Sequence, residues 1–189
     1  MKISRQYFLT ECLGGIAFIL CSVGFGSAES GFLSLRGWIA FLYMGILTVV
    51  ALIDWNTKII YDRFHIFIIL LGIASMGLFP EHTLTDRLLG AIVISAPMLV
   101  LALLIDGAFG GGDIKLMAAS GWLLGWRAMI PAIFIGILTG GIYCIWMLAR
   151  GKMTRKDRFA FGPFLAIGLA AACIYGDQML KWYLSVWQI

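Results

Sequence analysis

The chain has 189 residues, of which 61% are hydrophobic and only 13% are charged, and its mean hydropathy is +0.96. Because soluble domains carry about 25% charged residues, this composition excludes an ordinary soluble protein. It predicts a single all-α, polytopic membrane domain over residues 1–189. The net charge of +4 comes from lysines and arginines in short loops, so it indicates membrane orientation and not nucleic-acid binding.

Apolar runs predict about seven membrane-spanning helices, within a range of roughly six to eight. The third run ends at Pro80. The fifth run is only about 14 residues long, so it either crosses the membrane fully or is re-entrant. In chain order the predicted helices cover about residues 7–26, 37–53, 64–79, 88–105, 113–126, 128–149 and 159–176.

Residues 1–36 form an extra N-terminal helix before a predicted core at about residues 37–176. Lys2 and Arg5 precede an apolar run, as in a signal peptide. However, Glu11 interrupts this run and many more spans follow, so we predict a first helix that is retained.

Residues 177–189 form a tail after the predicted core. This tail either extends the last helix or lies in the membrane interface. Its aromatic side chains suit a headgroup layer; they are Trp182, Tyr183 and Trp187.

Cysteines and histidines form no recognisable metal site. The cysteines all lie in apolar runs and make no CxxC pair, so we expect small buried side chains without zinc or disulfides. His65 and His82 are far apart in the predicted arrangement, and we expect structural roles for both. The four cysteines are Cys12, Cys21, Cys144 and Cys173.

The charges of the loops predict the orientation. Residues 150–158, RGKMTRKDR, carry five Lys or Arg and one Asp, so the positive-inside rule places them in the cytoplasm. Counting membrane crossings back from this loop places the N-terminus, residues 54–63 and residues 106–113 in the cytoplasm too, provided that the fifth predicted helix crosses the membrane. The loops predicted to lie outside are 27–36, 80–87 and 126–127.

Two carboxylates then fall at the cytoplasmic ends of their helices. Asp54 ends the second predicted helix, and Asp113 follows three glycines at the start of the fifth. A carboxylate at this depth is costly unless it is paired or functional. Two carboxyl groups that share one site do not both ionise easily, so one acts as a base and the other as an acid. Hydrolysis of a peptide bond by two aspartates requires this pairing, because the base activates water and the acid protonates the leaving nitrogen.

Each of these residues also has a purely structural interpretation. Asp113 could cap a helix by binding the amides at 115 or 116, and Asp54 could simply end one. The glycines could form a hinge, or they could let an extended substrate approach and adopt unusual backbone angles. Lys115 could anchor the helix by snorkelling. We expect four charged residues to mark loop edges, and they are Asp62, Arg63, Asp86 and Arg87.

Residues 110–116, GGGDIKL, followed by AASGWLLG, resemble the GxGD segment of type IV prepilin peptidases, the bacterial leader peptidases of family A24. Asp54, followed by Ile60 and Asp62, resembles the family's first aspartate segment. Residues 161–171, FGPFLAIGLAA, resemble its FGPF segment. The order and spacing of the three segments match, and together they cover about residues 50–175.

The resemblance implies an aspartic endopeptidase with the GxGD membrane core and Asp54 and Asp113 as its catalytic pair. Such enzymes remove the basic leader of prepilins or pseudopilins after a Gly, at the cytoplasmic face of the inner membrane, in pilus biogenesis or type II secretion. No metal or cofactor is implied. The expected partners are the leader, the adjoining pilin helix and the lipid bilayer. We expect the substrate to be bound by Gly110, Gly111, Gly112, Lys115, Gly162 and Pro163.

The sequence departs from the family pattern in three places. Tyr61 replaces the expected Pro, and Asn56 stands where many members have a second Asp. Residues 27–36 contain none of the CxxC motifs of the bifunctional members, so we expect a peptidase without N-methylation and without S-adenosylmethionine. Asp62 and Asp106 are candidates for recognising the basic leader.

Two other functions remain open. One is a non-catalytic subunit of a pilus or secretion assembly, favoured by Tyr61 and Asn56. The other is a small proton-coupled transporter that uses the Asp pair. The sequence does not define the oligomeric state.

Overall fold

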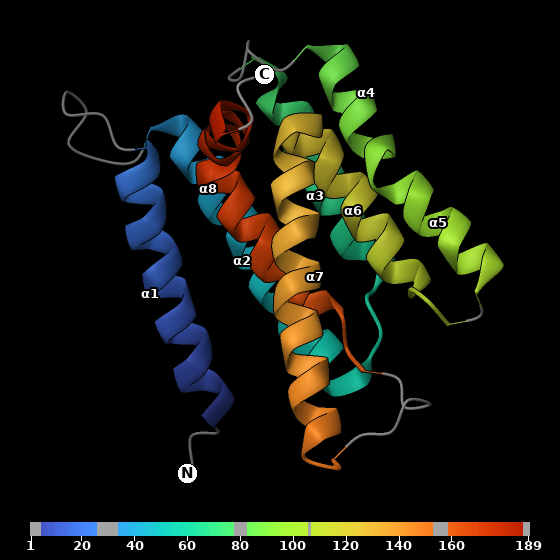
Figure 1. Cartoon of the computed structure of the whole chain (residues 1–189). Coiled ribbons are helices and arrows are strands. Elements are labelled where there is room, and N and C mark those ends of the chain that lie inside the picture. Colours follow the sequence, from blue (N-terminus) through green and yellow to red (C-terminus); the bar gives the residue numbers. More distant parts are fainter. Residues whose placement is uncertain (1–4, 26–33, 78–82, 106, 153–158, 187–189) are drawn as a thin grey trace.

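A computed structural model describes residues 5–25, 34–77, 83–105, 107–152 and 159–186. All regular structure in these residues is helical, which confirms the predicted all-α class (Figure 1). The helices are α1 (Arg5–Phe25), α2 (Leu35–Thr57), α3 (Asp62–Ala74) with the 3₁₀ turn η1 (Ser75–Gly77), α4 (Leu84–Val93), α5 (Ser95–Leu104), α6 (Gly111–Leu124), α7 (Trp126–Ala149) and α8 (Gly162–Val186).

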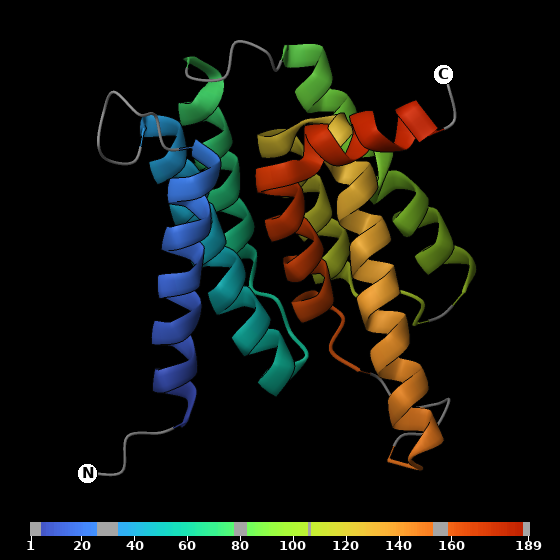
Figure 2. The ribbon, with the colours of Figure 1, turned by 60° about the vertical axis from the view of Figure 1, so that its left-hand side comes forward.

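The helices run up and down a bundle with two distinct ends (Figures 1 and 2). One end, called the site end below, holds the start of α1 and the last residues of α2, α5 and α7. The other, called the far end, holds the last residues of α1, η1, α6 and α8. α6 has only 14 residues; it reaches the far end, and its start lies at about the level of the middle of α7 in Figure 1.

Three described helical segments are long and apolar enough to cross a membrane. They are Leu35–Thr57, Leu84–Leu104 and Trp126–Ala149. Two shorter apolar segments, Thr10–Phe25 and Gly162–Gly176, run beside them. This supports a multi-pass membrane protein, whereas the total of about seven crossings stays a prediction.

The predicted fourth helix is divided in two. α4 ends at Val93 and α5 begins at Ser95, within the single run predicted at 88–105. Pro97 has no N–H to donate to the Val93 carbonyl, and its ring crowds that carbonyl. The Ser95 hydroxyl donates a hydrogen bond to the Ala91 carbonyl at the break.

The main core lies between α2, α6 and α8. Its most buried side chains include Leu47 of α2, Leu116 of α6 and Leu165 of α8. A smaller cluster joins α1 to α2, where Cys21 contacts Met44. The helices that carry the two aspartates are therefore part of the best-packed region.

Arg87 lies in the first turn of α4, near the predicted loop edge, but its side chain is fully buried inside the protein. α4 begins at Leu84 and not at about residue 88. Its Nη1 donates to carbonyl or hydroxyl oxygens 3.1–3.4 Å away. A cation is favourable there, because the last carbonyls of a helix have no partner within the helix. The acceptors are Gly72, Ser75, Trp122 and Leu123.

The tail extends the last helix, which is one of the two predicted arrangements. α8 continues to Val186, ten residues beyond the predicted end at about residue 176. Figure 2 shows its last turns running across the far end of α7. Trp182 is 69% exposed in this part of α8.

Candidate active site

Asp54 lies in the last turn of α2, at the site end. Only 5% of the residue is exposed. Its Oδ2 accepts a hydrogen bond from the Gly162 N–H at 2.9 Å. Gly162 is the first residue of α8, so the carboxyl group meets the end of a helix that favours negative charge. This contact joins two predicted site residues that are 108 positions apart.

Asp113 lies in the first turn of α6 and is 8% exposed. Its Oδ2 accepts a hydrogen bond from the Gly110 N–H at 3.2 Å. The interpretation of Asp113 as a helix N-cap was wrong, because α6 begins at Gly111 and Gly110 is the N-cap residue. The Asp113 side chain therefore points back toward the residue before the helix, as in a capping box.

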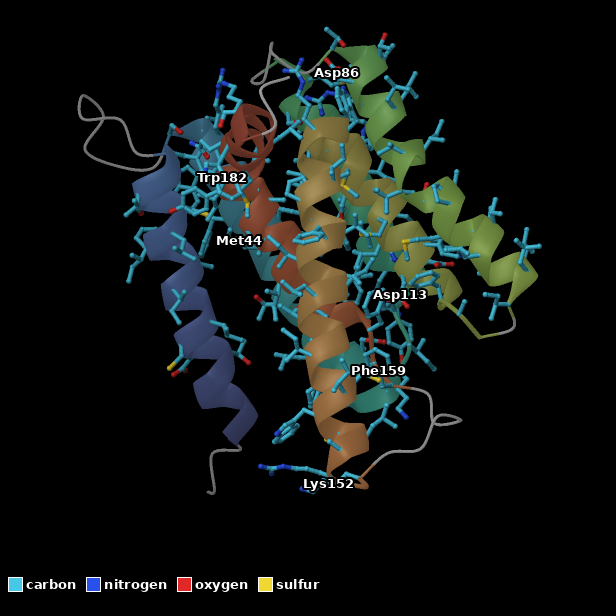
Figure 3. The ribbon with its side chains drawn as sticks, in the orientation of Figure 1. Met44, Asp86, Asp113, Lys152, Phe159 and Trp182 are labelled. Atoms are coloured by element: carbon cyan, nitrogen blue, oxygen red, sulfur yellow. The ribbon has the colours of Figure 1, made fainter. Side chains whose placement is uncertain are left out.

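The two carboxyl groups share one site. They are close enough for the charge of Asp54 to act on Asp113. Figure 3 labels Asp113 near the site end, on the same side of the bundle as Phe159. Among the described residues, no donor reaches the buried Oδ1 of Asp113. Each carboxyl group thus has one oxygen held by a glycine amide.

The site glycines provide space and not unusual backbone angles. The described glycines with positive φ are Gly107, Gly125 and Gly151, so residues 110–112 do not adopt the unusual backbone angles that glycine permits, whereas the hinge stays a prediction. A Cβ on Gly112 would lie 2.9 Å from the Cβ of Ile60. A Cβ on Gly111 would meet nothing within 4 Å. Gly111 is therefore the position where another chain has room to approach.

A Cβ on Gly110 or Gly162 would instead press on a catalytic candidate. The Gly110 position lies 3.0 Å from Oδ2 of Asp113, and the Gly162 position lies 2.7 Å from Oδ2 of Asp54. Pro163 follows in the first turn of α8, where its missing N–H costs no helical hydrogen bond. The motif residues thus explain how each carboxyl group reaches a backbone amide.

Lys115 is held by an ion pair that sequence reasoning missed. Its Nζ lies 2.8 and 3.0 Å from the two carboxylate oxygens of Asp62. The hydrogen bond from Lys115 holds the pKa of Asp62 below its usual range. His65 is buried, with Nδ1 3.5 Å from Asp62. The ion pair ties the first turn of α3 to the second turn of α6, across 53 positions that no local pattern connects.

An aromatic wall beside the site was also missed. Phe109 and Phe161 directly precede Gly110 and Gly162, and their ring centroids lie 5.8 Å apart. The Phe159 ring lies edge-on to Phe161 and tilted to Phe164, with ring centroids 6.0 Å apart in both pairs. The only sequence signal was the position of these aromatic residues beside the motif glycines.

Asn56 and Tyr61, which depart from the family pattern, do not disturb Asp54 or Asp113. Asn56 is exposed and donates to the Leu52 carbonyl at 2.7 Å, on a different side of α2 from buried Asp54. Tyr61 has φ −77° and ψ 138°, which is a conformation that proline also adopts. Asp106, His82 and residues 27–33 lie outside the described residues.

Comparison with known proteins agrees with this geometry. The model of the type IV leader peptidase family matches residues 41–145. Three curated proteins named prepilin leader peptidase/N-methyltransferase are similar. Those from Bacillus subtilis and Aeromonas salmonicida are each 29% identical, over 98% and 97% of the chain. The one from Pectobacterium carotovorum is 32% identical over 88%.

The chain spans only part of these relatives. It covers 72% of the Bacillus protein, 62% of the Aeromonas protein and 60% of the Pectobacterium protein. No solved structure gives a significant match. Because the family model matches more than half of the chain, the protein belongs to the type IV leader peptidase family.

Proposed function

We propose that the chain is a membrane aspartic endopeptidase that removes the leader of type IV prepilins or pseudopilins. The observation that carries the proposal is the convergence of two buried carboxyl groups, each held by a glycine amide at a helix start. A structural role for Asp54 or Asp113 alone would not require the other to be near. Family membership supports the same activity.

In the proposed reaction, one carboxylate removes a proton from water while the other, protonated, donates to the scissile carbonyl oxygen. The carboxyl group that took the proton from water then gives it to the departing nitrogen, and the other recovers its proton as the new carbonyl forms. The amides of Gly110 and Gly162 keep both side chains in place, so little reorganisation is needed at the moment of reaction. The aromatic wall of Phe109, Phe159 and Phe161 limits water beside the pair.

The substrate is proposed to enter at the site end with its leader in the cytoplasm and its apolar helix in the membrane. Open space at Gly111 suits an extended backbone that approaches the pair and is cut after a Gly. Asp62 is exposed and suits a basic leader, but only if Lys115 releases it. The basic residues 150–158 support a cytoplasmic site end in an inner membrane.

The chain is proposed to lack N-methylation. Its four cysteines are dispersed over the sequence and form no CxxC pair. Three of its curated relatives carry N-methyltransferase in their names, so this proposal separates the chain from them.

A cleavage assay in membranes tests the proposal. The chain is co-expressed with a tagged prepilin whose basic leader ends in Gly, beside Asp54→Asn and Asp113→Asn. We expect cleavage by the intact chain and a loss of about 10³-fold or more in each variant, because either change removes acid–base chemistry. The mass of the new N-terminus should show an unmethylated amine.

Cleavage that persists in one variant would remove that aspartate from the mechanism. Absence of cleavage by the intact chain, across several pilin classes, would instead favour a subunit of a pilus or secretion assembly. Asp62→Lys combined with Lys115→Asp separates two roles for the ion pair. Recovery relative to the single changes supports positioning of α6, whereas no recovery supports leader recognition by Asp62.

A further inference from the structure

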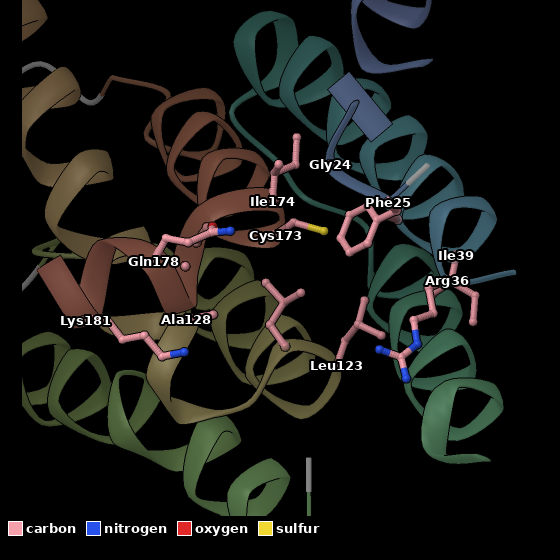
Figure 4. A pocket seen from close by; sticks show the side chains of 14 residues that line it. Gly24, Phe25, Arg36, Ile39, Leu123, Ala128, Cys173, Ile174, Gln178 and Lys181 are labelled. Carbon is pink, nitrogen blue, oxygen red and sulfur yellow. The ribbon is translucent and has the colours of Figure 1, made fainter. Parts of the chain in front are cut away.

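A cavity lies at the far end of the bundle, away from the aspartates. It has a volume of about 330 Å³ and lies where α1, α2, α6, α7 and α8 meet (Figure 4). Apolar side chains on its wall include Ile39, Leu123, Leu124 and Ile174. The proposed peptidase reaction does not use any of these residues.

Two cations line this cavity. Figure 4 shows Arg36 and Lys181 on opposite sides, with Leu123 between them. Gln178 adds an amide to the lining. Arg36 lies in the first turn of α2, whose backbone amides add positive potential. The combination of apolar and cationic side chains fits an amphipathic anion.

Aromatic residues place the cavity at the level of lipid headgroups. Trp38, Trp126 and Trp182 all lie on far-end segments, near the start of α2, the start of α7 and the last turns of α8. Tryptophan is enriched at membrane–water interfaces, where its ring is apolar and its N–H remains accessible to water. Lys181 immediately precedes Trp182, so its ammonium group lies at the same level.

We propose that this cavity binds the headgroup of an anionic phospholipid. The phosphate would lie between Arg36 and Lys181, and the glycerol and first acyl carbons would contact Leu123 and Ile174. A protein helix is a poorer occupant, because one helical turn about 10 Å across occupies roughly 400 Å³, more than the cavity. The inference does not depend on the peptidase activity.

Native mass spectrometry of the purified full chain in detergent tests this proposal. The probes are phosphatidylglycerol, phosphatidylcholine with the same acyl chains, and inorganic phosphate. We expect phosphatidylglycerol to bind more tightly than either other probe. Replacing both cations, Arg36→Gln with Lys181→Gln, should weaken phosphatidylglycerol binding about thirtyfold, and Lys181→Gln alone about fivefold.

Arg127→Gln is the matched control. Arg127 is an exposed cation at the same end, beside the Trp126 ring, and it does not line the cavity. This variant should bind phosphatidylglycerol like the original chain. Equal binding of the two lipids, an equal loss in the control, or equally tight binding of inorganic phosphate would each overturn the lipid site.

Discussion

At the scale of single residues, the site depends on two backbone amides. Asp54 and Asp113 come from helices that approach each other only in the folded chain, and each carboxyl group accepts a glycine N–H. Glycine is needed because any side chain would occupy the space of the carboxylate. This explains why Gly162 belongs to the site although it has no reactive side chain.

Gly162→Ala should therefore reduce cleavage without removing any catalytic group. The new Cβ would lie 2.7 Å from Oδ2 of Asp54, so the carboxylate must move or lose its amide partner. A displacement of about 1 Å at a reacting group can cost about 10²-fold in rate. We expect kcat/KM for prepilin cleavage to fall by at least about tenfold. Gly141→Ala is the control, since its Cβ meets nothing within 4 Å. Equal activity of the two variants would mean that Asp54 does not depend on this contact.

At the scale of helices, the position of α6 depends on a close crossing with α4. A Cβ on Gly90 would meet the backbone of Gly121, and a Cβ on Gly121 would meet the backbone of Gly90. Small residues let membrane helices approach in this way. The crossing and the buried Arg87 fix the far end of α6, while Asp113 occupies its first turn.

Gly90→Ala should destabilise the protein, because the added methyl group meets rigid backbone. We expect a loss of about 2 kcal/mol or more, as for other overpacked sites. Gly45→Ala should have the opposite sign, since its Cβ meets nothing within 4 Å and alanine favours a helix interior by about 0.5–1 kcal/mol. Thermal unfolding in detergent, followed by circular dichroism, compares the two variants. If the unfolding temperature of Gly90→Ala were no lower than that of Gly45→Ala, the crossing of α4 and α6 would not limit stability.

At the scale of the whole molecule, the bundle separates two chemistries. The aspartates and the glycine motif lie at the site end, and the cavity with Arg36 and Lys181 lies at the far end. In a bundle that crosses a membrane, these two ends and their two features lie on opposite sides. The orientation then decides which compartment supplies the substrate.

Cysteine labelling in intact cells tests this orientation. In a cysteine-free background, Asn56→Cys and Lys152→Cys should resist a membrane-impermeant maleimide until the cells are opened, because both are predicted to face the cytoplasm. Arg127→Cys, at the far end, should react at once. All three positions are exposed. Labelling of Lys152→Cys in intact cells would reverse the proposed orientation.

The sequence by itself determined the class of fold, the approximate helices and the two aspartates. Apolar composition excludes water-facing surfaces, and apolar runs of span length predict helices whatever their neighbours are. The motif residues around Asp54 and Asp113 lie within the stretch that matches the family model, and their order is local information. For the same reason, cysteine spacing predicts the absence of methylation, which remains to be tested.

Only the tertiary structure decided which side chains meet. The Lys115–Asp62 pair, the burial of Arg87 and the cavity between five helices join segments that are far apart in the chain. In an apolar sequence, lipid-facing and buried residues look alike, so periodicity does not say which face of a helix packs. The physical reason is that contacts between helices depend on crossing points such as Gly90 and Gly121, where shape and not hydrophobicity selects the partner.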